Sequence, residues 1–223
     1  MKVFIIGAAG GIGIRLAKAL VSTGDTVTGM VRNPDHHEPV PAAGATPIRG
    51  DLVSDSVGEL STKMSGHDAV VFTAGAHGAG MEQTTLIDGK GVEKAAAAAT
   101  QAGARRFVLV SAYPEAAADP NGISEGYAHY LRTKKAAEVF LTGTTLDWVI
   151  VRPGHLLDGP GDGLVTAGLA LVEKDVRRDN VAAFIAAALH NPELNRTIIE
   201  LTDGSTPVSD AVAQVARSVG PRL

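Results

Sequence analysis

The chain opens on a short apolar run that leads straight into a cluster of glycines: Val3-Phe4-Ile5-Ile6-Gly7-Ala8-Ala9-Gly10-Gly11-Ile12-Gly13. The apolar run predicts a strand over Val3–Ile6 that is buried on both faces. Apolar residues at helical spacing after the glycines predict a helix over Ile12–Ser22. Strand, glycine turn and helix together are the first unit expected of a parallel sheet that is covered by helices.

The spacing of the glycines suits the binding of a dinucleotide. Gly7 permits a tight turn, Gly10 lets a pyrophosphate approach the backbone, and Gly13 lets the helix pack closely on the sheet. The start of the helix offers unpaired amides and the positive end of its dipole to the phosphates. The alternative is a purely structural turn, because glycine is common between any strand and helix. The segment predicted to bind the nucleotide comprises Gly7, Ala9, Gly10, Gly11, Ile12 and Gly13.

Strands and helices alternate along the rest of the chain. Further strands are predicted over Thr26–Val31, Thr46–Arg49, Ala69–Thr73, Phe107–Val110, Trp148–Val151 and Thr197–Leu201. Helices are predicted over Ser54–Met64 (with Ser54 or Asp55 as N-cap), Thr84–Ala102, Gly126–Leu141, Asn180–His190 and Val208–Val219. This order predicts an α/β fold: a doubly wound, mostly parallel sheet, or Rossmann fold. A Gly/Pro-rich loop follows Val151, and we expect residues 152–223 to form a small C-terminal extension on the substrate side.

Composition narrows the class of protein. The 223 residues are 45% apolar and 20% charged, which is typical of one globular domain, and we expect 1–223 to form a single domain. A net charge of −4 gives no reason to expect nucleic acid or a membrane as partner. The chain has no cysteine, so thiolate catalysis and disulfides are excluded, and the seven histidines show no metal-ligand spacing. With no targeting segment recognised, the expected location is the cytoplasm.

The end of the second predicted strand bears on the choice of cofactor. A protein specific for NAD usually has an acidic residue there, which accepts a hydrogen bond from the ribose 2′-hydroxyl. This chain has Arg32 and Asn33 instead, and an arginine can pair with a 2′-phosphate. The sequence therefore favours NADPH over NADH, although Arg32 could also be a solvated surface residue. Asp51 and Leu52 follow the third strand and could line the adenine pocket, or Asp51 could cap the next helix.

Several short motifs occur in an order that is typical of one superfamily. They are Gly7-x-x-Gly10-x-x-Gly13, Asp51-Leu52, Phe72-Thr73-Ala74-Gly75, Tyr130-x-x-x-Lys134, Leu146 to Gly154, Arg178 to Ala182 and Leu201 to Gly204. Together they resemble a short-chain dehydrogenase/reductase of the extended or atypical kind, closest to the NAD(P)H-binding, NmrA-like group. We expect Thr73, Ala74 and Gly75 to pass under the cofactor ribose, the alternative being an ordinary exit from the strand into a loop. Pro153 and Gly154 are expected to lie beside the nicotinamide.

Tyr130 and Lys134 carry the chemical hypothesis. Residues i and i+4 share one face of a helix, and a lysine ammonium is expected to lower the pKa of the tyrosine beside it. Tyr130 could then exchange a proton with the oxygen of a carbonyl or alcohol during hydride transfer. The resemblance implies that Lys134 also holds the nicotinamide ribose. The alternative is a packed tyrosine and a solvated lysine, since such pairs are frequent on helices.

A hydroxyl after the fifth predicted strand should complete the site. The resemblance places a serine or threonine there to bond the substrate oxygen, and the run is Val110-Ser111-Ala112-Tyr113-Pro114. Either Ser111 or Tyr113 could donate that bond, or Ser111 could satisfy the backbone at the strand end.

These residues predict an NADP(H)-dependent oxidoreductase that acts on a small carbonyl, quinone or flavin-like acceptor. Two alternatives stay open: a non-catalytic protein that senses NADP(H), and an epimerase or isomerase that retains its cofactor. The expected partner is a small-molecule substrate, with neither nucleic acid nor membrane, and the protein could be a monomer or a homodimer.

Overall fold

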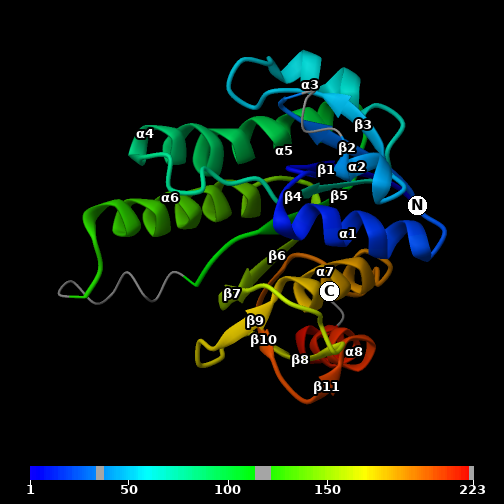
Figure 1. Ribbon diagram of the computed structural model, residues 1–223, viewed down its shortest axis with the longest axis vertical. Coiled ribbons are helices and arrows are strands. Elements are labelled where there is room, and N and C mark those ends of the chain that lie inside the picture. The colour runs from blue at the N-terminus through cyan, green and yellow to red at the C-terminus, as the bar shows by residue number, and fades with distance from the viewer. Residues whose placement is uncertain (34–37, 114–121, 221–223) are drawn as a thin grey trace.

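A computed structural model describes residues 1–33, 38–113 and 122–220. Within these residues the main sheet has nine strands in the order β11-β8-β10-β6-β5-β4-β1-β2-β3, and β7 and β9 form a separate pair (Figure 1). The strands are β1 Lys2–Ile6, β2 Thr26–Val31, β3 Thr46–Arg49, β4 Ala69–Phe72, β5 Arg106–Val110, β6 Asp147–Pro153, β7 His155–Leu157, β8 Leu164–Gly168, β9 Asp175–Arg177, β10 Thr197–Asp203 and β11 Thr206–Pro207.

The sheet confirms the predicted doubly wound topology. From β3 to β10 neighbouring strands run parallel, and β8 and β11 add an antiparallel edge. The chain goes from β1 outward to β2 and β3, then crosses back to β4 on the other side of β1. The strand order therefore reverses between β1 and β4, and in folds of this kind a ligand binds at the carboxyl ends of the strands at such a point.

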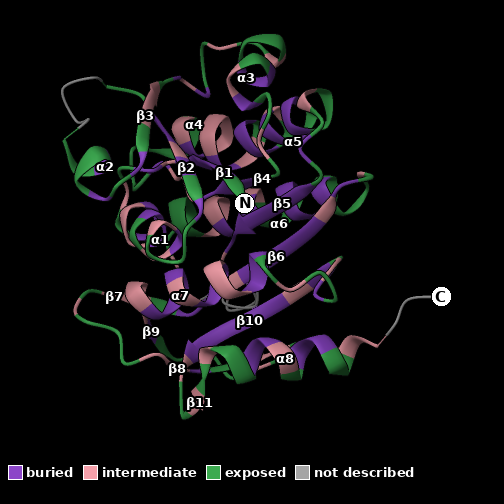
Figure 2. Cartoon of the chain, turned by 90° about the vertical axis from the view of Figure 1, so that its right-hand side faces the viewer, coloured by how far each residue is buried: buried purple, intermediate pink, exposed green. Residues whose placement is uncertain are grey.

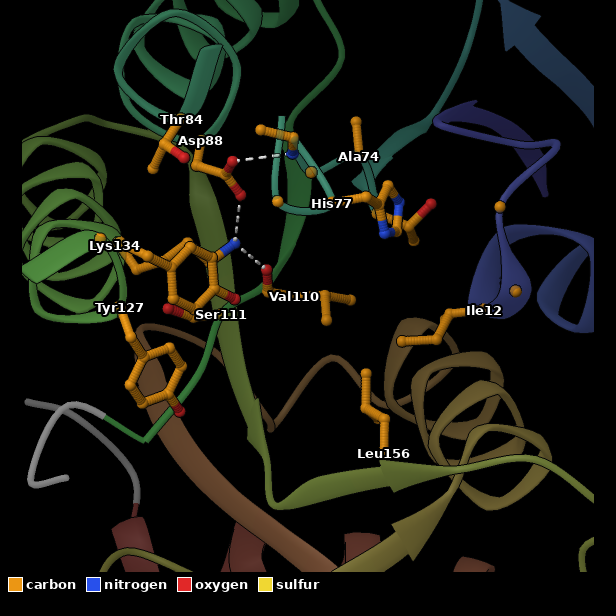
Figure 3. Close-up of a pocket in the computed structure, with 18 of the residues that line it drawn as sticks. Ile12, Ala74, His77, Thr84, Asp88, Val110, Ser111, Tyr127, Lys134 and Leu156 are labelled. Carbon is orange, nitrogen blue, oxygen red and sulfur yellow. Dashed lines mark hydrogen bonds and ion pairs between the residues drawn. The ribbon is translucent and has the colours of Figure 1, made fainter. Parts of the chain in front are cut away.

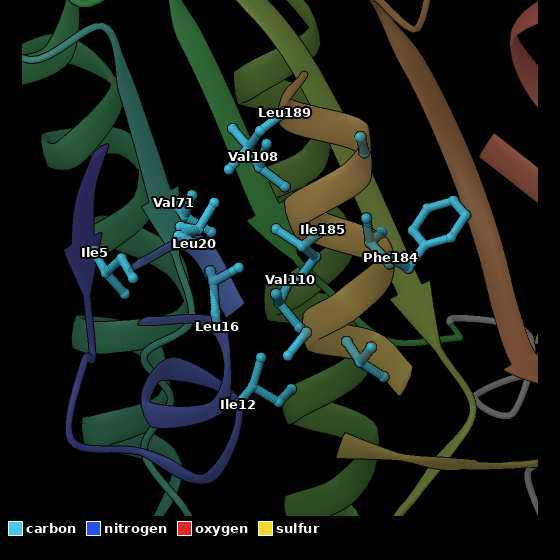
Figure 4. Packing of buried hydrophobic residues seen from close by; sticks show 14 of the residues in the cluster. Ile5, Ile12, Leu16, Leu20, Val71, Val108, Val110, Phe184, Ile185 and Leu189 are labelled. Atoms are coloured by element: carbon cyan, nitrogen blue, oxygen red, sulfur yellow. The ribbon is translucent and has the colours of Figure 1, made fainter. Parts of the chain in front are cut away.

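The helices cover both faces of this sheet. They are α1 Gly11–Ser22, α2 Pro39–Ala42, α3 Val57–Met64, α4 Met81–Thr84, the π-helix η2 Thr85–Lys90, α5 Gly91–Ala102, α6 Glu125–Thr142, α7 Arg178–Leu189 and α8 Val208–Val219. Side chains alternate along each buried strand, so that Val3 and Ile5 face α1 and α7 while Phe4 and Ile6 face α3 and α5. Figure 4 shows Leu16 and Leu20 of α1 packed with residues of α7 against the first of these faces.

Helices cover both apolar faces of the central part of the sheet. The central strands β1, β4 and β5 are buried along nearly their whole length, as Figure 2 shows. This burial explains the continuous apolar runs in the sequence, since a parallel sheet between two helix layers has no solvated face. The same burial leaves the strand ends as the places where polar side chains can gather around a ligand.

The structure corrects four details of the sequence analysis. The helix predicted from Ser54 begins at Val57, and its N-cap is Ser56, which forms a capping box with Glu59. The helix predicted over Thr84–Ala102 is instead α4, η2 and α5 in succession. The four-residue helix α2 was not predicted. Four short strands beyond Val151 were not predicted: β7, β8 and β9 lie between β6 and α7, β11 follows β10, and none of the four exceeds five residues.

Candidate functional site

Two adjoining cavities lie along the carboxyl ends of β1, β2, β4 and β5. The first has a volume of about 580 Å³ and the second about 540 Å³. Both are lined by Gly10 and by residues 73–77 after β4, so they form one cleft that crosses the switch point of the sheet. A single elongated ligand could therefore occupy both, with its middle over the glycine turn.

The glycine turn has the geometry that a phosphate needs. Gly7 has a φ of +83°, and a Cβ there would lie 2.7 Å from the backbone nitrogen of Ala74. A Cβ on Gly13 would clash with the carbonyl oxygen of Gly7, so only glycine allows α1 to approach this closely. The N-cap of α1 is Gly10, and no side chain among the described residues caps the helix. The first amides of α1 are thus left for an anion at the cavity lined by Gly10, Gly11 and Ile12.

The second cavity contains the residues predicted to hold the adenosine end. It is lined by Gly7, Ala9, Arg32, Asn33, Asp51 and Leu52, among others. The Arg32 side chain is exposed and forms no ion pair with any described residue, so its guanidinium is available to an anionic ligand. The carboxylate of Asp51 accepts a hydrogen bond from the Val53 amide at 2.8 Å and does not cap α3, so the capping alternative was wrong. Its contact with adenine stays a prediction.

The first cavity brings together the predicted catalytic residues. Ser111 enters from the end of β5, and Tyr130 and Lys134 enter from α6. Ser111 is 4% exposed, and its hydroxyl has no hydrogen-bond partner among the described residues. A buried hydroxyl without a partner is costly, so its position at the cavity suggests a bond to a ligand. Tyr113 is also buried but is not among the described residues that line either cavity.

Lys134 is held by contacts that the sequence did not indicate. Its ammonium donates a hydrogen bond to the carbonyl of Val110 at 2.8 Å and lies 3.6 Å from the carboxylate of Asp88 (Figure 3). Asp88 is 1% exposed, comes from the π-helix η2, and accepts a hydrogen bond from the Ala76 amide at 2.9 Å. Burial lowers the pKa of Lys134, and the Asp88 carboxylate opposes that change. A single π-helical turn inside a helix is frequent at functional sites.

The expected effect of Lys134 on Tyr130 was wrong for the protein without ligand. Burial raises the pKa of Tyr130, and the nearby Asp88 carboxylate and Tyr127 raise it further. The reason is that Lys134 points its charge at Asp88 and the end of β5, so the phenolate gains nothing that outweighs its desolvation. Tyr130 is therefore a neutral phenol that can donate a proton. Tyr127 stacks on it, with ring centroids 5.9 Å apart.

Some predicted site residues lie elsewhere. Gly13, Pro153 and Gly154 are not among the described residues that line either cavity. Gly13 acts through packing, and Gly154 donates its amide to the Leu201 carbonyl between β6 and β10. The glycine-rich segment from Gly75 to Gly80, with His77, was also expected from the sequence to border the pocket, and His77 does line it. Other lining residues were not predicted, among them Met81, Asp88, Leu156 and Arg178. Nothing in the sequence marks Asp88, because it lies inside an ordinary helical pattern.

Two further features bear on the class of site. In the part of the chain that the structure describes, no cluster of three or more His, Asp or Glu side chains is arranged to hold a metal ion. No helix in that part has the length and apolar character needed to cross a membrane.

Known proteins match this chain over nearly its whole length. A family profile described as NAD(P)H-binding matches residues 7–192. The chain is similar to the "Uncharacterized sugar epimerase YhfK" of Bacillus subtilis, with 36% identity over 217 residues that cover 96% of this chain and 100% of that one.

Solved structures give the same picture. A Bacillus halodurans protein, named as a proposed NAD-dependent epimerase/dehydratase, has a TM-score of 0.88 and 31% identity, covering 96% of this chain and 100% of its own. The oxidoreductase ylbE of Lactococcus lactis has a TM-score of 0.84 and 26% identity, covering 96% of both chains.

Proposed function

The chain belongs to the NAD(P)H-binding family, within the atypical short-chain dehydrogenase/reductase-like proteins, and from this premise we propose that it is an NADP(H)-dependent oxidoreductase acting on a small carbonyl, quinone or flavin-like acceptor. One observation carries the proposal. The cavity that receives the uncapped start of α1 also receives Ser111, Tyr130 and Lys134. A dinucleotide whose phosphates bind at α1 would thus extend toward groups able to bind and protonate an oxygen atom.

The cofactor and the protein would divide the chemistry between them. A bound nicotinamide supplies or accepts the hydride. In the reductive direction the phenol of Tyr130 donates its proton to the carbonyl oxygen as that oxygen gains negative charge. The unpartnered hydroxyl of Ser111 donates a hydrogen bond to the same oxygen and orients it.

Lys134 would position the cofactor. An ammonium has three N–H donors, and the described contacts to Val110 and Asp88 engage two of them. The third is left for a ribose hydroxyl. Because Lys134 is buried and tied to β5 and η2, it would hold that ribose in one place relative to Tyr130.

Preference for NADPH rests on Arg32. Its exposed guanidinium borders the second cavity, where the ribose that carries a 2′-phosphate in NADPH would lie. Asn33 borders the same place. The acidic residue in the described lining of this cavity is Asp51, which follows the neighbouring strand β3 and not β2. A fork of N–H donors next to that position favours the phosphorylated cofactor.

An epimerase that retains its cofactor is the second candidate. The name of the B. subtilis relative, which calls it a sugar epimerase, favours it. The same residues would serve. The phenolate form of Tyr130 would take the proton of an alcohol and later return it, while a retained nicotinamide would accept the hydride and give it back to the other face of the resulting carbonyl carbon. The cofactor would show no net consumption.

The test is NADPH consumption against a panel of quinones, flavins and aldehydes, with wild type, Tyr130→Phe and Lys134→Ala. Lys135→Ala is a matched control, because Lys135 is the next residue of α6 and is exposed. We expect turnover with at least one acceptor, a large loss in the first two variants and none in the control. Tight NADPH binding without turnover of any acceptor would contradict the oxidoreductase and leave two candidates, the epimerase that retains its cofactor and an NADP(H) sensor. Equal rates in wild type and Tyr130→Phe would remove the proton-transfer role.

A further inference from the structure

Arg178 reaches the glycine turn from the other half of the chain. It is the first residue of α7, and it lines the first cavity together with Gly10, Gly11 and Ile12. A Cβ on Gly11 would lie 2.9 Å from Cδ of Arg178 and 3.1 Å from its Nε. The arginine side chain therefore occupies the space that a larger residue at position 11 would fill. The absence of a side chain on Gly11 brings a guanidinium to the uncapped start of α1.

The contacts of Arg178 leave most of its donors available. Nη1 lies 3.1 Å from a carboxylate oxygen of Asp158 and donates to the Leu156 carbonyl at 3.3 Å. Among the described residues both contacts are made by Nη1, which leaves the hydrogens of Nε and Nη2 for a ligand in the cavity. The Asp158 side chain is 77% exposed, whereas that of Arg178 is 26% exposed. The carboxylate therefore sits at the mouth of the site, on the solvent side of the guanidinium.

We propose that Arg178 binds the pyrophosphate of the cofactor and that Asp158 competes with the cofactor for this guanidinium. The inference rests on the proposed NADP(H) binding at α1. An exposed ion pair contributes little, so a pyrophosphate with more charge and better-placed oxygens can displace Asp158. Asp158 would then lose its contact with Arg178 and keep its ion pair with Arg15, whose Nη2 lies 3.6 Å from the Asp158 carboxylate.

The position of Arg178 favours the pyrophosphate over the substrate. Figure 3 shows Ile12 and Leu156 on one side of the cavity, and Ser111 and Lys134 on the opposite side. Arg178 bonds to Leu156 and lies over Gly11, so it belongs to the side of the α1 amides. A negative charge there is attracted by the helix start and by the arginine together.

The experiment measures the Kd of NADPH and of 2′-phospho-ADP-ribose, which keeps the pyrophosphate but lacks nicotinamide. We expect Arg178→Met to weaken both ligands about tenfold or more, because a charge-assisted bond is lost. Arg177→Met is the matched control: Arg177 is the adjacent arginine, pairs with Asp203 and lines neither cavity in the described part of the chain, so both Kd values should stay within about twofold. An unchanged Kd in Arg178→Met, or a loss for NADPH alone, would overturn the inference.

Competition by Asp158 has its own readout. Asp158→Asn should tighten binding of both ligands by up to about fivefold, and most of this gain should disappear in the Asp158→Asn, Arg178→Met double variant. An equal gain in both backgrounds would mean that Asp158 merely repels the anion. Because the Asp158 side chain is exposed, Asp158→Asn should fold normally and still tests the competition if Arg178→Met folds poorly. If Asp158→Asn binds the two ligands no more tightly than wild type does, the proposed competition is wrong. Wild type that binds neither ligand would contradict the proposed function itself.

Discussion

The ammonium of Lys134 lies 3.6 Å from the carboxylate of Asp88, and the two side chains are 6% and 1% exposed. Asp88 also accepts the Ala76 amide, and Lys134 donates to the Val110 carbonyl. This buried pair thus ties α6 to the end of β5 and to the segment after β4 that lines both cavities. Asp88 is a positioning residue, because its contacts are to Lys134 and the backbone of the site.

The pair predicts a specific pattern of stability. Lys134→Met or Asp88→Asn alone leaves a buried group without its partner and should reduce the free energy of unfolding by about 3–5 kcal/mol. The double variant should be destabilised by less than the sum of the two, because it leaves no uncompensated charge. Urea denaturation of the four proteins measures this coupling. Strictly additive losses would show that the two groups do not interact.

The titration of Tyr130 gives a second prediction. Since burial and the Asp88 carboxylate disfavour the phenolate, the difference in phenolate absorbance between wild type and Tyr130→Phe should have its midpoint above the ordinary value of about 10. Asp88→Asn should move this midpoint downward. Carbonyl reduction uses the protonated phenol, so its rate should be maintained until the pH reaches this midpoint. Alcohol oxidation uses the phenolate, so its rate should rise as the pH increases toward the midpoint. A midpoint in the free protein below the unperturbed value of about 10 would contradict the assigned electrostatics.

Ser111→Ala should separate catalysis from stability. The Ser111 hydroxyl has no partner among the described residues, so its removal should leave the melting temperature unchanged or raise it slightly. If the hydroxyl stabilises charge on the substrate oxygen, kcat should fall on the order of 100-fold while the Kd of NADPH stays the same. Ser111→Thr, which keeps a hydroxyl, should restore part of the rate. A full rate in Ser111→Ala would exclude the role.

Arg32→Ala tests the choice of cofactor. Loss of a charge-assisted bond to the 2′-phosphate should weaken NADPH about tenfold or more and leave NADH almost unchanged. Arg49→Ala is the control, since Arg49 is exposed at the end of the neighbouring strand β3 and is not among the described residues that line the cavities. Titration of both cofactors gives the ratio of their Kd values. The same ratio in wild type and Arg32→Ala would refute the phosphate contact.

Asp55 should make the free energy of unfolding depend on pH in the acidic range. Burial tends to raise its pKa, but hydrogen bonds from Lys63 at 3.0 Å and from the Asp51 amide outweigh burial and lower it. A pKa lowered in the folded state adds stability above the unfolded value of about 3.9, and this is lost as the pH falls through the folded value. Asp55→Asn should therefore be less stable than wild type near neutrality, with a gap that narrows below about pH 4. Urea unfolding across this range checks it, and a constant gap would contradict the lowered pKa.

The sequence by itself determined the fold class and the glycine turn between β1 and α1. Continuous apolar runs, helical spacing and the glycines at 7, 10 and 13 act over a few neighbouring residues, so the strand, turn and helix they specify can be recognised locally. The i, i+4 spacing of Tyr130 and Lys134 likewise placed both on one helix face, and both line one cavity.

Only the tertiary structure decided which charges meet. Asp88 lies 46 positions before Lys134 in the chain, and Arg178 lies 167 positions after Gly11, yet each pair is in contact because the sheet brings separate crossover units to one edge. These contacts reversed the expected pKa shift of Tyr130, since Lys134 is directed at a carboxylate. The short strands after Val151 were decided in the same way: runs of two to five residues carry too little local signal, and pairing with β10 or with each other is what makes them strands.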